Sequence, residues 1–146
     1  MTQLTEHFTL EELTFSSTAQ RLGIDNTPSL ETVSHLTTLA MGLEKIRTLL
    51  GYPLHIDSGY RCEALNREVN GARNSAHLTG YAADFICQQF GTPQQIVRAI
   101  NASGIVVDQM IEEGTWVHVS FDPQMRNQYL IAHFSPQGTT YTEGVA

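Results

Sequence analysis

The sequence predicts a single α+β domain in which helices come first and a mainly antiparallel sheet follows. Two observations carry this prediction. Apolar residues recur at helical spacing from about residue 28 to 50, and short apolar runs bounded by turn residues fill much of residues 81–134. The length of 146 residues fits one domain. We expect the domain to span residues 1–146, with a core from about residue 8 to 134 and a loose polar tail from 135 to 146.

Helices are expected at about residues 9–16, 28–50, 62–70 and 92–104. Thr9 and Glu12 have the spacing of a capping box, which marks the start of the first helix. Threonine–proline pairs at 27–28 and 92–93 predict the starts of the second and fourth helices, because proline is favoured in the first helical turn. Glycines at 51, 71 and 104 are expected to end the last three helices.

Strands are expected at about residues 54–57, 81–87, 105–112, 115–121 and 129–134. The third and fourth of these strands are separated only by a short turn at Glu113–Gly114, which predicts a hairpin. The candidate functional residues of the chain lie mainly in this second part of the sequence, which is predicted to form the sheet.

The composition excludes several classes of function. Fifteen acidic residues against eight basic ones give a net charge of -7, which argues against nucleic-acid or anionic-membrane binding. No apolar stretch reaches the 18 residues of a membrane span. The N-terminus lacks a signal-peptide pattern, so synthesis in the cytoplasm is expected. Cys62 and Cys87 are expected to be two buried, reduced thiols, although their pairing stays open.

Three residues are candidate metal ligands. Asp84 lies inside an apolar run, where a carboxylate needs a counter-charge or a metal. His118 lies in a second apolar run, on the strand face that it shares with Trp116 and Ser120. His77 precedes Asp84 by seven positions. Two imidazoles and one carboxylate suit Zn²⁺ with an open coordination position. On spacing alone, a hydrogen-bonded histidine–aspartate pair is an equally good interpretation.

The pattern Ser75-x-His77-x-x-Gly80-x-Ala82-x-Asp84, followed by Trp116-x-His118, resembles the signature of the M15 zinc peptidases. These are D-alanyl-D-alanine carboxypeptidases and L-alanyl-D-glutamate endopeptidases that act on bacterial peptidoglycan. The similarity extends upstream through Ser58-Gly59-Tyr60-Arg61 and covers about Phe8 to Phe134. It is closest to the short, single-domain branch common in phages and prophages. The resemblance implies a hedgehog/DD-peptidase-like fold, with N-terminal helices packed on a small sheet that carries the zinc site.

The resemblance also implies a role for each site residue. His77, Asp84 and His118 become the zinc ligands. Arg61 becomes the residue that binds a substrate carboxylate or carbonyl and stabilises the oxyanion, as suits a guanidinium that forks onto two oxygens. The general base is an acidic residue shortly before the last ligand, which makes Glu113 the first candidate and Glu112 the alternative. The residues expected to contact the substrate are Arg61, Ser75, Tyr81 and Trp116.

The implied function is a zinc-dependent peptidase that hydrolyses an amide bond in the peptide stem or cross-link of peptidoglycan, as an endolysin-like endopeptidase or a DD-carboxypeptidase. The alternatives are a catalytically inactive, zinc-containing cell-wall-binding or phage structural module, and a hydrolase of the same chemistry on another small peptide. The expected partner is the peptidoglycan peptide, without nucleic acid or membrane insertion, and the protein is expected to be a monomer. Action at the cell wall or periplasm would follow release from the cytoplasm.

Overall fold

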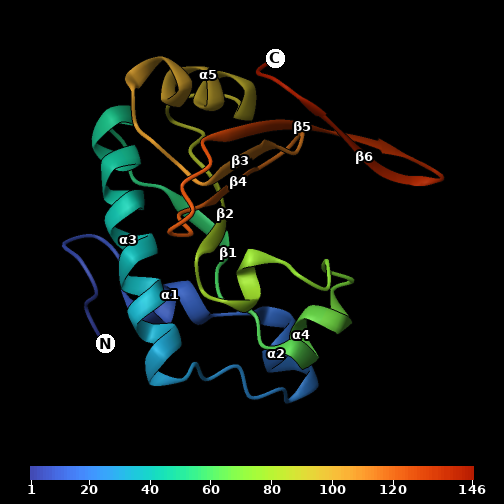
Figure 1. The fold of residues 1–146 in the computed structure, drawn as a ribbon. Coiled ribbons are helices and arrows are strands. Elements are labelled where there is room, and N and C mark those ends of the chain that lie inside the picture. The colour runs from blue at the N-terminus through green and yellow to red at the C-terminus, as the bar shows by residue number, and fades with distance from the viewer.

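Three helices precede the first strand in the computed structural model, which describes residues 1–146 (Figure 1). The helical elements are α1 (Leu10–Thr14), α2 (Ser17–Leu22), α3 (Leu30–Leu50), α4 (Glu63–Glu68), the 3-10 turn η1 (Ala76–Leu78) and α5 (Pro93–Ser103). The strands are β1 (His55–Ser58), β2 (Ala82–Ile86), β3 (Gln109–Glu112), β4 (Val117–Ser120), β5 (Gln128–Ser135) and β6 (Gly138–Glu143). The predicted α+β class is confirmed. None of the helices is long and apolar enough to cross a membrane.

The six strands form one sheet in the order β1-β2-β4-β3-β5-β6. All neighbours are antiparallel except β3 and β5, which pair in parallel. The predicted hairpin between β3 and β4 is confirmed. The Glu113 N–H donates to the Trp116 carbonyl at 3.0 Å across the turn, and Gly114 supplies the positive φ of 81°. The sheet is therefore mainly antiparallel, as expected.

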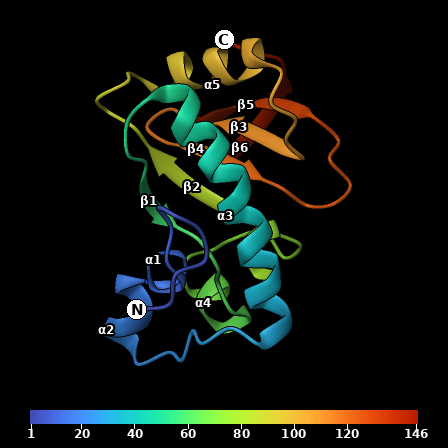
Figure 2. The ribbon, with the colours of Figure 1, turned by 90° about the vertical axis from the view of Figure 1, so that its left-hand side faces the viewer.

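Helices α3 and α5 pack on the same face of the sheet and against each other (Figure 2). The apolar stripe predicted for α3 is buried, with Leu36, Leu43 and Ile46 at 0 % exposure. It meets Phe85 of β2 and Val119 of β4, which are also fully buried. Because side chains alternate along a strand, the residues next to these core positions point to the other face of the sheet. That second face is where the site lies.

One helix was not predicted, and another begins later than predicted. Helix α2 was not expected, because residues 17–22 are mostly polar. The Ser16 hydroxyl caps it by accepting the Ala19 N–H at 3.1 Å, and Gly23 ends it with a left-handed conformation. Helix α3 begins after a cap at Ser29 instead of at the threonine–proline pair, because the Ser29 hydroxyl accepts the Thr32 N–H at 3.2 Å.

The prediction of a loose tail at residues 135–146 is wrong. Residues Gly138–Glu143 form β6, which pairs with β5 from Leu130↔Glu143 to Ser135↔Gly138. All six residues of β6 are exposed, so the strand is held by backbone hydrogen bonds and has no apolar pattern to reveal it. Gly138, at φ 123°, makes the tight turn between the two strands.

Cys62 and Cys87 are free thiols. Cys87 is buried in the hydrophobic core at 3 % exposure, and Cys62 is half-buried at the start of α4. The two thiols are therefore unpaired, as expected, but the expected burial holds only for Cys87.

Candidate active site

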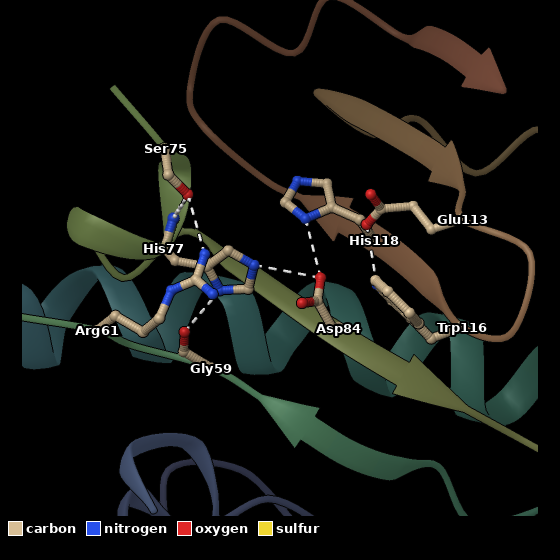
Figure 3. Close-up of polar contacts among 8 residues, drawn as sticks. All are labelled: Gly59, Arg61, Ser75, His77, Asp84, Glu113, Trp116 and His118. Carbon is tan, nitrogen blue, oxygen red and sulfur yellow. Dashed lines mark hydrogen bonds and ion pairs between the residues drawn. The ribbon is translucent and has the colours of Figure 1, made fainter. Parts of the chain in front are cut away.

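The three predicted metal ligands meet on the open face of the sheet (Figure 3). In the register between β2 and β4, Asp84 lies directly opposite His118, so the two side chains are neighbours on one face. His77 comes from η1, where the Ser75 hydroxyl accepts the His77 N–H at 3.1 Å. The Asp84 Oδ1 atom lies 3.2 Å from His77 Nε2 and 3.0 Å from His118 Nδ1.

The hydrogen bonds and charge of His77 show whether the three side chains fit a metal ion. Its Nδ1 lies 2.7 Å from the Gly59 carbonyl, which can only accept, so Nδ1 carries the proton. Burial lowers the pKa of His77 more than the nearby Asp84 charge raises it, so the ring is neutral and Nε2 is a bare lone pair. This lone pair faces a carboxylate oxygen at 3.2 Å. Two lone pairs at that distance call for a cation between them.

The spacing of the donor atoms agrees with this assignment. The three ligand atoms all lie within 4.8 Å of one another. A tetrahedral zinc ion with bonds of 2.0–2.1 Å holds its ligand atoms roughly 3.3 Å apart. The two histidines are buried, at 2 % and 8 % exposure, and the Gly59 carbonyl orients the first of them as outer partners of metal-binding histidines do. The triad therefore fits Zn²⁺.

Asp84 is ionised in this setting. Burial by itself would raise the pKa of its carboxyl. The pKa of Asp84 is nevertheless held well below its ordinary value, and His118, whose Nδ1 lies 3.0 Å from Oδ1, is among the groups that lower it. The carboxylate is thus available as an anionic ligand at all physiological pH values.

Gly59 links the first helix to the His77–Asp84–His118 triad. A Cβ atom at this position would lie 2.2 Å from the carbonyl oxygen of Leu13, so the close approach of α1 admits only glycine. The neighbouring Tyr60 N–H donates to the same Leu13 carbonyl at 2.8 Å. The segment after β1 is therefore pinned in place, with the Gly59 carbonyl aimed at His77.

Arg61 lies beside the triad. Its backbone N–H donates to the His77 carbonyl at 3.0 Å, and its Nη2 lies 3.4 Å from the Ser75 hydroxyl. Its Nε is buried and has no hydrogen-bond partner in the protein. Burial lowers the pKa of the guanidinium, opposed by the Asp84 and Glu113 charges, but arginine stays charged at any physiological pH. Because Arg61 lines the cleft, its charged guanidinium is suited to bind an oxygen of a bound ligand.

The structure separates the two candidate bases. Glu113 lines the cleft with the triad, and the Trp116 indole N–H donates to its Oε2 at 2.8 Å (Figure 3). Burial, assisted by the Asp84 charge, raises the pKa of Glu113. Glu112 lies on the other side of β3 at 6 % exposure, where its carboxylate accepts from Gln94 of α5 and from the Gly114 N–H. Only Glu113 is near the triad.

The predicted substrate-contacting residues divide in the same way. Arg61, Ser75 and Trp116 line the cleft. Tyr81 does not: its ring stacks on His35 of α3, with the ring centroids 4.2 Å apart. The tyrosine lies just before β2, so its side chain turns to the helix side of the sheet. The structure thus does not bring Tyr81 to the site.

The cleft around the triad has a volume of about 530 Å³ and extends further than the sequence indicated. Five further lining residues come from β3, β5, β6 and the loop before β5: Gln109, Ile111, Arg126, Leu130 and Tyr141. Tyr141 lies in the tail that was expected to be loose. The alternating apolar residues Leu130, Ala132 and Phe134 are a signal in the sequence that one face of β5 is covered.

Comparison with known proteins bears on this site. The family model described as Peptidase M15 matches residues 6–120, which include every ligand of the triad, Arg61 and Glu113. Strands β5 and β6 follow the matched stretch. The comparison with curated proteins found no match.

Proposed function

The chain belongs to the peptidase M15 family, and from this premise we propose that it hydrolyses an amide bond in the peptide stem or cross-link of bacterial peptidoglycan. Membership assigns it to the zinc-dependent metallopeptidases. The observation that carries the proposal is the His77–Asp84–His118 triad at the base of an open cleft, with Arg61 and Glu113 beside it. A structural zinc site would be closed by a fourth protein ligand, whereas this one has three.

His77, Asp84 and His118 would hold the zinc ion, which when bound supplies Lewis-acid activation of a carbonyl and of a water molecule. Glu113 takes the proton from the attacking water and returns it to the leaving amine. The Trp116 indole holds one carboxylate oxygen of Glu113 and leaves the other for this task. The Arg61 N–H groups donate to the substrate carbonyl oxygen as negative charge develops on it.

The cleft supports a peptide substrate. Its lining combines small and polar residues of the segment that leads into η1 (70–72 and 74–76) with apolar and charged side chains of the sheet. We propose action at the cell wall, as an endolysin-like endopeptidase or a DD-carboxypeptidase, by a monomer. These finer assignments come from the motif resemblance, and the products of the reaction would choose between them.

The test is digestion of purified peptidoglycan by the protein with zinc, with a chelator, and with zinc restored after chelation. We expect clearing that disappears with the chelator and returns with zinc. Mass spectrometry of the released fragments then identifies the bond: loss of a terminal D-alanine indicates a carboxypeptidase, and cleavage within or between stems indicates an endopeptidase. A zinc-loaded, folded protein that releases nothing would contradict the peptidase proposal and favour an inactive wall-binding module.

A further inference from the structure

The cleft contains a second arginine besides Arg61. The chain has only eight basic residues against fifteen acidic ones, yet two arginines, Arg61 and Arg126, line this one cleft. Arg61 follows β1 and Arg126 precedes β5, and the strand order places the metal-binding strands β2 and β4 between them. The two guanidinium groups therefore lie on opposite sides of the triad.

Arg126 forms an ion pair with a buried carboxylate. Its Nε and Nη2 donate to the two carboxylate oxygens of Asp108 at 2.9 and 3.0 Å, a bidentate pair. Asp108 is 2 % exposed and also accepts from the Ser120 hydroxyl at 3.1 Å. The residues on either side, Met125 and Asn127, both have positive φ, at 42° and 52°. Non-glycine residues adopt that conformation at a cost, so the loop is held in one unusual shape around Arg126.

The ion pair leaves part of the guanidinium free. The two bonds to Asp108 use one edge of a group with five N–H donors. The Arg126 side chain is still 49 % exposed and lines the cleft. Two neighbours complete this end of the cleft. Leu130 of β5 adds an apolar surface and Tyr141 of β6 adds a hydroxyl.

We propose that Arg126, flanked by Leu130 and Tyr141, is a carboxylate-binding subsite that selects substrate peptides with an acidic group on the far side of the scissile bond from Arg61. This proposal rests on the peptidase function proposed above. Neighbouring strands lie roughly 4.8 Å apart, so the four steps from β1 to β5 span roughly 19 Å. A ligand that reaches both arginines is therefore a peptide of several residues. An ion pair that only joins β3 to β5 would not distinguish an acidic ligand from its amide.

The test uses synthetic L-alanyl-γ-D-glutamyl-L-lysyl-D-alanyl-D-alanine and two versions of it, one amidated at the glutamate α-carboxylate and one at the C-terminus. Binding to the zinc-loaded Glu113→Gln variant is measured by calorimetry, and kcat and KM are measured with the active protein. We expect amidation at one of the two positions to weaken binding at least about tenfold and to raise KM more than it lowers kcat.

The variant that tests the residue is Asp108→Asn combined with Arg126→Gln, which removes both charges and leaves no unpaired buried carboxylate. In this double variant we expect the acidic peptide and its amide to bind equally. The matched control is Arg98→Gln on α5, away from the cleft, which should keep the discrimination. Equal binding of all three peptides by the protein with Arg126 intact, or discrimination that persists in a folded double variant, would overturn the subsite.

The two proposals fail separately. Selective binding without hydrolysis contradicts the peptidase function and retains the subsite. Hydrolysis without any preference for the acidic peptide contradicts the subsite alone.

Discussion

Replacement of Glu113 by glutamine is expected to remove most of the hydrolytic activity while leaving the fold and the metal site intact. Glutamine has the same shape, and its side-chain oxygen can still accept the Trp116 indole N–H, which lies 2.8 Å from Oε2 in the native protein. The position is only half-buried, so the substitution leaves no buried charge unpaired. What is lost is the ability to take a proton. General acid–base catalysis contributes about 10²–10⁴ to the rate, or about 3–5 kcal/mol of activation free energy.

The measurement compares kcat of Glu113→Gln with that of Glu112→Gln on the same peptide, with zinc content and thermal unfolding recorded for both. Glu112 accepts hydrogen bonds from Gln94 and from the Gly114 N–H while buried, so its loss should lower stability by about 1–3 kcal/mol and leave most of kcat. A zinc-loaded Glu113→Gln protein with native kcat, beside an inactive but folded Glu112→Gln protein, would refute the reasoning and transfer the role to Glu112.

Three further predictions concern stability and the metal site. Gly59→Ala places a Cβ 2.2 Å from the Leu13 carbonyl oxygen, so it should lower the unfolding free energy by about 3 kcal/mol or more and weaken zinc binding about 10–100-fold through His77. The control is Gly104→Ala, at a position with φ 84° and open space around it. Equal losses for the two variants in denaturant and zinc titrations would argue against the Leu13 contact. Leu43→Ala, at a fully buried position, should lower the unfolding free energy by about 2–5 kcal/mol. Met41→Ala, on the exposed side of α3, should change it by less than about 0.5 kcal/mol. Similar values for the two variants would mean that α3 faces the sheet differently. Burial would raise the pKa of Asp108, but Arg126 and Ser120 outweigh it and hold the pKa below the ordinary value. This carboxylate therefore stabilises the fold above about pH 4 and loses that effect as pH falls through its native pKa. A plot of unfolding free energy against pH should be flatter on the acid side for Asp108→Asn than for the native protein, and parallel curves would exclude this contribution.

The local features of this protein were predictable from its sequence because they depend on residues close together in the chain. The start of α5 follows from the Thr92 cap and the proline after it, and the buried face of α3 from its apolar spacing. The candidate zinc ligands could be predicted for a related reason. A histidine or an aspartate inside a short apolar run is costly without a partner, so His118 and Asp84 stand out even before their partners are known.

The choice between Glu112 and Glu113 depended on the tertiary structure. Adjacent residues of a strand point to opposite faces, and the sequence does not show at which residue the β3–β4 turn interrupts that alternation. The folded chain places Glu112 against α5 and Glu113 in the cleft. The position of the Tyr81 side chain outside the cleft also depends on tertiary structure, because its stacking on His35 joins residues from α3 and the start of β2.

The end of the cleft formed by Arg126 and β6 also depends on tertiary structure and could not be predicted from the sequence. Strand β6 is exposed along its whole length, so the backbone hydrogen bonds that hold it have no counterpart in the apolar pattern of the sequence. The Asp108–Arg126 pair joins residues on either side of the β3–β4 hairpin and depends on the parallel pairing of β3 with β5. Sequence patterns show which side chains need burial or a partner, whereas contacts between distant segments exist only once the sheet has assembled. Thus the sequence indicated the candidate metal ligands, and the fold determined which residues surround them.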